Sequence, residues 1–236
     1  MMIKAKTKKL ITVFLILGIF AVGSIMNNGL IPNTSGGIGI SPYLIGPKII
    51  VDPVILEGEK NQPQYSNQNL ENPALNQLLE KVIDGRANMI RGIYADDILA
   101  LPVVQQPSGQ AGFVSTIDGV VTEFSMPSSY GVTGLLAHNY LSGKYFSDFS
   151  IGDEIQIVYG DGSIKRYLVA EIQSYQALQP NSPNSQFVDL ESSEQISASQ
   201  LFKRVYIGDH HLTLQTCIER GGVDSWGRMF IIAYPI

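Results

Sequence analysis

The chain has 236 residues, which is enough for one or two domains with a sizeable core, and it is 44% hydrophobic and 16% charged, with 23 Gly and 12 Pro. This composition is typical of a β-rich globular protein with many turns and excludes a coiled coil or a disordered chain. The net charge of -5 and the pI near 5.2 argue against a nucleic-acid binder, which normally carries a basic face.

The first 26 residues predict export. Four lysines lie among the first nine residues, and an uncharged apolar run follows from Leu10 to Met26. A helix over that run would be about 26 Å long, near the lower limit for spanning a bilayer. The basic flank is expected to stay in the cytoplasm, so that the rest of the chain lies outside. A cleaved signal peptide is the alternative, with Ala21-Val22-Gly23 as its cleavage site. Both interpretations export the chain.

Residues 27–94 are expected to form an extracytoplasmic linker, because they are rich in Asn, Gln, Gly, Ser and Pro. An apolar stretch, IIVDPVIL, interrupts the linker at 49–56. Helical spacing of apolar residues predicts one short helix near 73–85, and residues 86–100 show no decisive pattern.

From about residue 101 the pattern is that of short strands. Seven or so segments are rich in β-branched and aromatic residues and are separated by turn signals, which predicts an all-β barrel or sandwich. Asp161-Gly162 lies between two of the segments and predicts a two-residue type I′ hairpin turn. The long connection at 179–204 is expected to include a short helix near Ser197–Arg204 and to shape one wall of a groove.

Cys217, in the strand-like run HLTLQTCIER, is the single cysteine of the chain. A lone exported cysteine cannot form an intrachain disulfide, so it is either a buried packing residue or a nucleophile. His211 lies about 20 Å from Cys217 along a regular strand, and His210 has the opposite parity. The pair is therefore interpreted as a solvated strand entry. His138, at the exit of the apolar run GVTGLLAH, remains as a candidate base, with strand capping as its structural alternative.

Two arginines could supply positive charge near the thiol. Arg220 is closer in sequence but lies in the turn after Cys217. Arg228 opens the next strand, and if the two strands pair antiparallel it faces Cys217 across the hairpin. The acidic residues of the turn are rival, purely structural partners for Arg228.

These residues resemble those of the sortases. TLQTC at 213–217 is similar to the T-L-x-T-C signature of that family, and GRMFIIAYPI resembles the following strand with its active-site arginine. Upstream, the segment from GLLAHN through GKYF to the hairpin resembles the part of a sortase that starts at the catalytic histidine. The resemblance covers roughly 95–236, which is expected to be the catalytic domain. It implies a closed β-barrel of about eight strands with short helices, preceded by a membrane helix and a linker.

The resemblance also implies roles. Cys217 would be the nucleophile, His138 the acid and base, and Arg228 the stabiliser of the oxyanion or of the peptide carbonyl; Thr216 matches a threonine implicated in substrate or oxyanion contacts. The protein would be a cysteine transpeptidase that cleaves a C-terminal sorting signal resembling Leu-Pro-x-Thr-Gly and transfers the product to an amine of a cell-wall peptide or a pilin lysine.

The implied partners are secreted proteins with such signals, the amine acceptor and the cell membrane, but no nucleic acid. No metal or organic cofactor is required. Calcium would need carboxylates such as Asp189, Glu191 and Glu194, but three carboxylates at this spacing are more often a solvated face, so the sequence does not support a calcium site. Two alternatives stay open: a cysteine peptidase that only hydrolyses, and a non-catalytic barrel that binds peptide or wall polymer.

Overall fold

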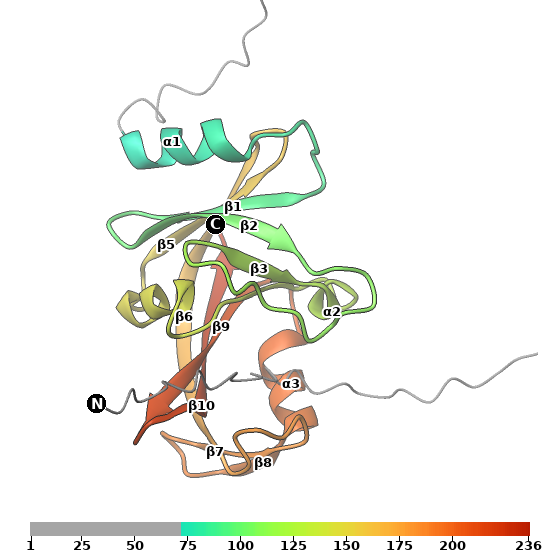
Figure 1. Ribbon diagram of the computed structural model, residues 1–236, viewed down its shortest axis with the longest axis vertical. Coiled ribbons are helices and arrows are strands. Elements are labelled where there is room, and N and C mark those ends of the chain that lie inside the picture. Colours follow the sequence, from blue (N-terminus) through green and yellow to red (C-terminus); the bar gives the residue numbers. More distant parts are fainter. Residues whose placement is uncertain (1–71) are drawn as a thin grey trace, which may run out of the picture. The chain divides into compact units, whose positions relative to one another are not determined.

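The computed structural model of the chain describes residues 72–236 (Figure 1). The expected anchor or signal peptide at 1–26 and most of the expected linker lie outside this range. Within it, no helix combines the length and the apolar character needed to cross a bilayer.

Eight strands form a closed barrel. They hydrogen-bond in the order β10-β9-β4-β3-β2-β1-β5-β6, and pairing of β10 with β6 closes the ring. The pairs β2–β3 and β4–β9 are parallel and the others are antiparallel. The strands are β1 (Ile90–Ala95), β2 (Leu99–Gln105), β3 (Val121–Phe124), β4 (Thr133–Leu136), β5 (Glu154–Tyr159), β6 (Ile164–Ala177), β9 (Leu212–Arg220) and β10 (Val223–Pro235). The expected all-β closed barrel of about eight strands is confirmed.

The remaining elements extend or cover this barrel. Strands β7 (Gln186–Asp189) and β8 (Gln195–Ser197) continue the sheet outward from β6. The helices are α1 (Pro73–Val82), α2 (Ser125–Ser128) and α3 (Ala198–Tyr206), and a 3-10 helix, η2, spans Ser142–Asp148. In Figure 1, α1 lies beside β1, whereas α3 lies with β7 and β8 at the other end of the barrel.

The folded unit begins earlier than the expected boundary at residue 95. Asn72 caps α1 through its side chain, Pro73 occupies the first turn, and the apolar side of the helix packs on Tyr94 and Val158. β1 begins at Ile90 and is a full member of the barrel. Its burial does not alternate along the strand, because α1 covers its outer face, and so the period-two signal of a strand is missing. The expected helix near 73–85 is confirmed.

Two apolar layers lie on the two faces of the barrel wall. Side chains inside the barrel include Ile93, Leu135, Leu214 and Ile231. A second cluster lies outside, between the wall and the layer formed by α3, β7 and β8; it includes Phe124, Leu136, Tyr175, Tyr206, Phe230 and Ile232. Since successive side chains of a strand point to opposite faces, residue parity decides which layer a side chain enters.

Helix α3, expected near Ser197–Arg204, is fixed by local sequence. Ser197 and Gln200 form a reciprocal capping box at its first turn. Arg204, in its last turn, forms ion pairs with Asp189 and Glu194. Two of the three carboxylates considered for calcium therefore bind an arginine, and residues 72–236 contain no cluster of three or more potential metal-ligating side chains.

The β5–β6 turn differs from the expected type I′ turn. The Gly162 amide donates to the Tyr159 carbonyl, Tyr159 donates to Ser163, and Gly162 has φ of 85° while Asp161 is not left-handed. This is a type I turn followed by a left-handed glycine, the three-residue form of a hairpin. It forms because Asp161 accepts bonds from the amide and hydroxyl of Ser163, which fixes it in the ordinary right-handed region.

Replacing Gly162 tests this turn. We expect Gly162→Ala to lower the free energy of unfolding by about 1–2 kcal/mol, because alanine is strained at positive φ. Gly162→Asn should lose less, since asparagine tolerates that region. Urea unfolding of the two variants measures the difference. Equal stability of the alanine variant and the wild type would contradict the assignment.

Candidate active site

Three strands bring the predicted site residues into one row. The parallel register of β4 and β9 pairs Leu136 with Gln215, and two positions further along it places His138 level with Cys217. The Ala137 amide continues this ladder by donating to the Gln215 carbonyl at 3.2 Å. On the other side of β9, Arg228 of β10 is the direct antiparallel partner of Cys217. The expected pairing of Cys217 with Arg228 across the hairpin is confirmed.

The three side chains also share one face. Leu136 and Phe230 belong to the outer apolar layer, and both lie two positions from a site residue on their own strands. Alternation therefore sends His138, Cys217 and Arg228 to that same face, beside the layer of α3, β7 and β8. Their exposed fractions are only 3%, 7% and 4%. The register thus places a thiol, an imidazole and a guanidinium at neighbouring positions on one face, where little water reaches them.

The electrostatic setting of the thiol is mixed. Burial raises the pKa of Cys217, because a thiolate loses hydration there; the positive charge of Arg228 lowers that pKa and the negative charge of Asp224 raises it. The net shift is upward. At neutral pH, therefore, Cys217 is mainly a thiol, and Arg228 is the group that favours its deprotonation.

His138 is held neutral by the same dry environment. Burial lowers its pKa, and a hydrogen bond with the Val114 backbone offsets part of this shift. Its Nδ1 atom is buried without a hydrogen-bond partner among the described residues. The ring stacks against Tyr140, with 5.1 Å between ring centroids. A neutral imidazole with an unused nitrogen is suited to accept a proton from a neighbouring thiol.

Arg228 is held by backbone carbonyls. Its Nη1 donates to the carbonyls of Ser225 and Gly227 at 2.9 and 2.8 Å, and its Nη2 donates to Pro180 at 3.4 Å. Within residues 72–236 no carboxylate forms an ion pair with it, so the rival partners in the turn do not neutralise it. Its full charge therefore remains available to a thiolate or to an oxyanion.

Thr216 points to the other face of β9. Its parity is opposite to that of Cys217, and its buried hydroxyl donates to the Ala137 carbonyl at 2.9 Å. The side chain therefore faces away from the thiol, and the substrate or oxyanion contact expected for it stays a prediction. The hydroxyl ties β9 to the residue that precedes His138.

Gly143 was missed as a site-supporting residue in the sequence. Its amide donates to the His138 carbonyl at 2.9 Å. A Cβ atom added to it would lie 2.3 Å from the Thr216 hydroxyl and 2.7 Å from the Ala137 carbonyl oxygen. Only glycine fits this position, where the start of η2 packs onto the Thr216–Ala137 contact. Gly143 is the first residue of the GKYF segment that resembles the sortases, but the resemblance assigned it no role.

The other candidates lie elsewhere. His210 bonds to the Gly131 carbonyl and to the Tyr167 hydroxyl. His211 is buried rather than solvated, with its ring nitrogens on the carbonyls of Asp209 and Val205. The Arg220 guanidinium lies over the Trp226 ring, 4.9 Å from its centroid.

No family model matches the chain, and no curated protein matches it. Solved structures that resemble it are sortases. A Listeria monocytogenes sortase A is 13% identical over 65% of this chain and 88% of its own, with a TM-score of 0.41. A Streptococcus suis sortase C1 is 18% identical over 69% of this chain and 78% of its own, with a TM-score of 0.42. A Streptomyces coelicolor sortase E1 is 17% identical over 66% of this chain and 91% of its own, with a TM-score of 0.39. At such low values, function has to be argued from the site itself.

The support given by Thr216 can be tested by a matched pair of variants. Thr216→Val keeps the shape but leaves the buried Ala137 carbonyl without its donor, so we expect a loss of about 1–3 kcal/mol in the free energy of unfolding. Thr216→Ser keeps the donor and should lose less. Urea unfolding measures both. A valine variant with wild-type stability but weakened substrate binding would instead indicate a direct substrate contact.

Proposed function

We propose that the protein is a cysteine transpeptidase of the sortase type. It would cleave a sorting signal resembling Leu-Pro-x-Thr-Gly near the C-terminus of secreted proteins and join the new acyl end to an amine. The apolar run at 10–26 would anchor it in the cell membrane with its catalytic domain outside. The observation that carries the proposal is the row of His138, Cys217 and Arg228 on one face of three adjacent strands.

Acylation would begin with proton transfer from the Cys217 thiol to the neutral His138 imidazole. The thiolate then attacks the threonine carbonyl carbon, and the charge that develops on the carbonyl oxygen is stabilised by Arg228. When the tetrahedral intermediate collapses, His138 returns its proton to the leaving amine. A thioester remains on Cys217, and the C-terminal part of the signal is released.

Transfer would reverse these steps with a new amine. The acceptor amine attacks the thioester carbonyl, His138 takes up the proton that this nitrogen loses, and the thiolate of Cys217 departs. The thiolate regains the proton from His138, so that atoms and charge balance over one turnover. A thiol, a proton carrier and a cation suffice for this chemistry, and it calls for no metal or organic cofactor.

Product analysis tests this function against its alternatives. With a signal peptide and a glycine oligopeptide as acceptor, we expect the wild type to form the joined amide product, detected by mass spectrometry. Cys217→Ala should form neither joined nor hydrolysed product while keeping its unfolding midpoint. Cleavage that persists in that variant would contradict the proposal. Free carboxylate as the single product would favour a hydrolase, and no cleavage at all would favour a binding barrel.

The two arginines provide a matched control within the same assay. Arg228→Gln should lower turnover by about 100-fold or more, because a buried positive charge on the strand next to Cys217 is removed. Arg220→Gln should stay within a few-fold of the wild type, since that side chain is exposed and lies over Trp226. Equal losses would show that the wrong arginine has been placed in the site.

The pH dependence of Cys217 alkylation tests the charges around the thiol. Because its folded pKa is raised, the thiolate forms at a higher pH than in the unfolded chain, and the midpoint of iodoacetamide reactivity should lie above that of the urea-unfolded protein. Arg228→Gln removes the lowering charge and should move the midpoint further up. Asp224→Asn removes a raising charge and should move it down.

The direction in which Asp224→Asn shifts the alkylation midpoint distinguishes the possible causes of the raised pKa. If burial acts alone, neither substitution moves the alkylation midpoint. If the Asp224 variant moves it upward, the assigned electrostatic relation between that carboxylate and the thiol is wrong. The raised pKa of Cys217 also links stability to pH: the stability is fully present below the unfolded thiol's pKa and is lost as the pH rises from that value through the folded pKa.

A further inference from the structure

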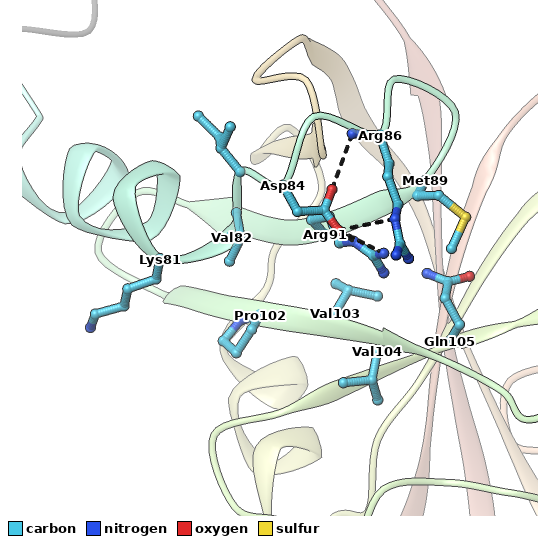
Figure 2. Close-up of a pocket in the computed structure, with 11 residues that line it drawn as sticks. Lys81, Val82, Asp84, Arg86, Met89, Arg91, Pro102, Val103, Val104 and Gln105 are labelled. Atoms are coloured by element: carbon cyan, nitrogen blue, oxygen red, sulfur yellow. Dashed lines mark hydrogen bonds and ion pairs between the residues drawn. The ribbon is translucent and has the colours of Figure 1, made fainter.

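A cleft opens in the barrel wall where β1 and β2 separate (Figure 2). The β1–β2 ladder reaches Gly92 and Pro102 and extends no further in that direction. Pro102 has no N–H to donate, and β1 is irregular between Ile90 and Gly92. The Gln105 amide spans the gap by donating to the Ile90 carbonyl at 2.9 Å.

The cleft has the size of a small-molecule site. Its volume is about 540 Å³, inside the roughly 300–1,000 Å³ range of ligand pockets. Figure 2 shows Pro102, Val103 and Val104 on one side and the residues from the end of α1 to β1 on the other. The lining combines an apolar part (Val82, Ile83, Met89, Pro102, Val103, Val104) with a polar part (Lys81, Asp84, Arg86, Arg91, Gln105).

The polar part is positively charged although the whole chain is acidic. It holds three cationic side chains against one carboxylate, Asp84. Arg91 is bound to Asp84 at 2.9 Å and is only 15% exposed, so it is fixed in place. Arg86 lies 3.7 Å from Asp84, beyond hydrogen-bonding distance, and is 66% exposed. Its guanidinium can therefore bind a ligand without giving up an existing hydrogen bond.

One further carboxylate lies behind the cleft. Burial raises the pKa of Glu123, while a hydrogen bond from Gln105 and the charge of Arg91 lower it. Even when Glu123 is ionised, the cations at the cleft outnumber the carboxylates. A ligand that fits must thus supply negative charge to the two arginines and apolar surface to the valines.

We propose that this cleft binds a small amphipathic oxyanion, meaning a carboxylate or phosphate group on a short aliphatic body. The oxyanion lies against Arg86 and Arg91, and the aliphatic part lies against Val82, Met89 and Val103. The site is separate from the proposed catalytic row, since β1 and β2 carry none of its three residues and are not hydrogen-bonded to β9 or β10.

Methyl NMR of the methionines provides a direct test. The full-length chain, labelled with ¹³C at the methionine methyls and held in lipid nanodiscs, is titrated separately with hexyl phosphate, hexanoate, inorganic phosphate and hexanol. Met89 lines the cleft, whereas Met126 and Met229 lie on other elements and serve as internal references. We expect hexyl phosphate or hexanoate to shift Met89 in a saturable way, and to bind at least about tenfold more tightly than phosphate or hexanol.

Arg86→Gln should weaken that binding about tenfold, because a charge-assisted hydrogen bond is lost at an exposed position that the fold does not need. Arg220→Gln, which removes the same charge far from the cleft in sequence and topology, should leave it unchanged. The proposal is overturned if Met89 does not respond saturably, if hexanol or phosphate binds as tightly as the amphipathic anions, or if Arg86→Gln binds like the wild type.

Discussion

The parallel pairing of β9 with β4 is the contact on which the site depends. It brings Cys217 beside a residue nearly eighty positions earlier in the chain, and it is fixed at its end by the Thr216 hydroxyl on the Ala137 carbonyl. Gly143 packs directly onto this contact and binds the His138 carbonyl. A parallel pair cannot be made by a tight turn, so β4 and β9 are joined by a long connection that includes β5 to β8. The row of His138, Cys217 and Arg228 therefore depends on contacts between distant parts of the chain.

Burial sets the charge states in this row. A thiol and an imidazole are both less costly to bury when neutral, and their pKa values shift in opposite directions for that reason. Arg228 cannot become neutral, so its charge is met by three carbonyl oxygens instead of a carboxylate. An ion pair there would have weakened its field at Cys217. In the proposed mechanism, Arg228 supplies the positive charge while Cys217 and His138 exchange a proton.

Contacts between residues that are close in the chain could be predicted from the sequence, whereas contacts between distant residues could not. The Cys217–Arg228 pairing follows from a single hairpin, and the helix at 198–206 carries its own capping signal. His138 remained as a candidate base once His210 and His211 had been set aside, but its place beside β9 did not follow from any spacing rule. The role expected for Thr216 came from the resemblance to sortases, although strand alternation already placed its side chain on the other face. β1 was missed because α1 covers it, which removes the alternation that marks a strand.

The dryness of the site bears on transfer as opposed to hydrolysis. A thioester on Cys217 would lie where the three site residues are less than a tenth exposed, so bulk water has little access to its carbonyl. In the proposed reaction, an acceptor amine that binds next to Cys217 would bring its nucleophile in at high effective concentration, whereas water would enter unassisted. Tyr140, half exposed and stacked on His138, covers the imidazole that must take the acceptor's proton. Burial thus raises the cost of forming the thiolate, and in the proposed reaction the same burial would favour an amine over water in resolving the thioester.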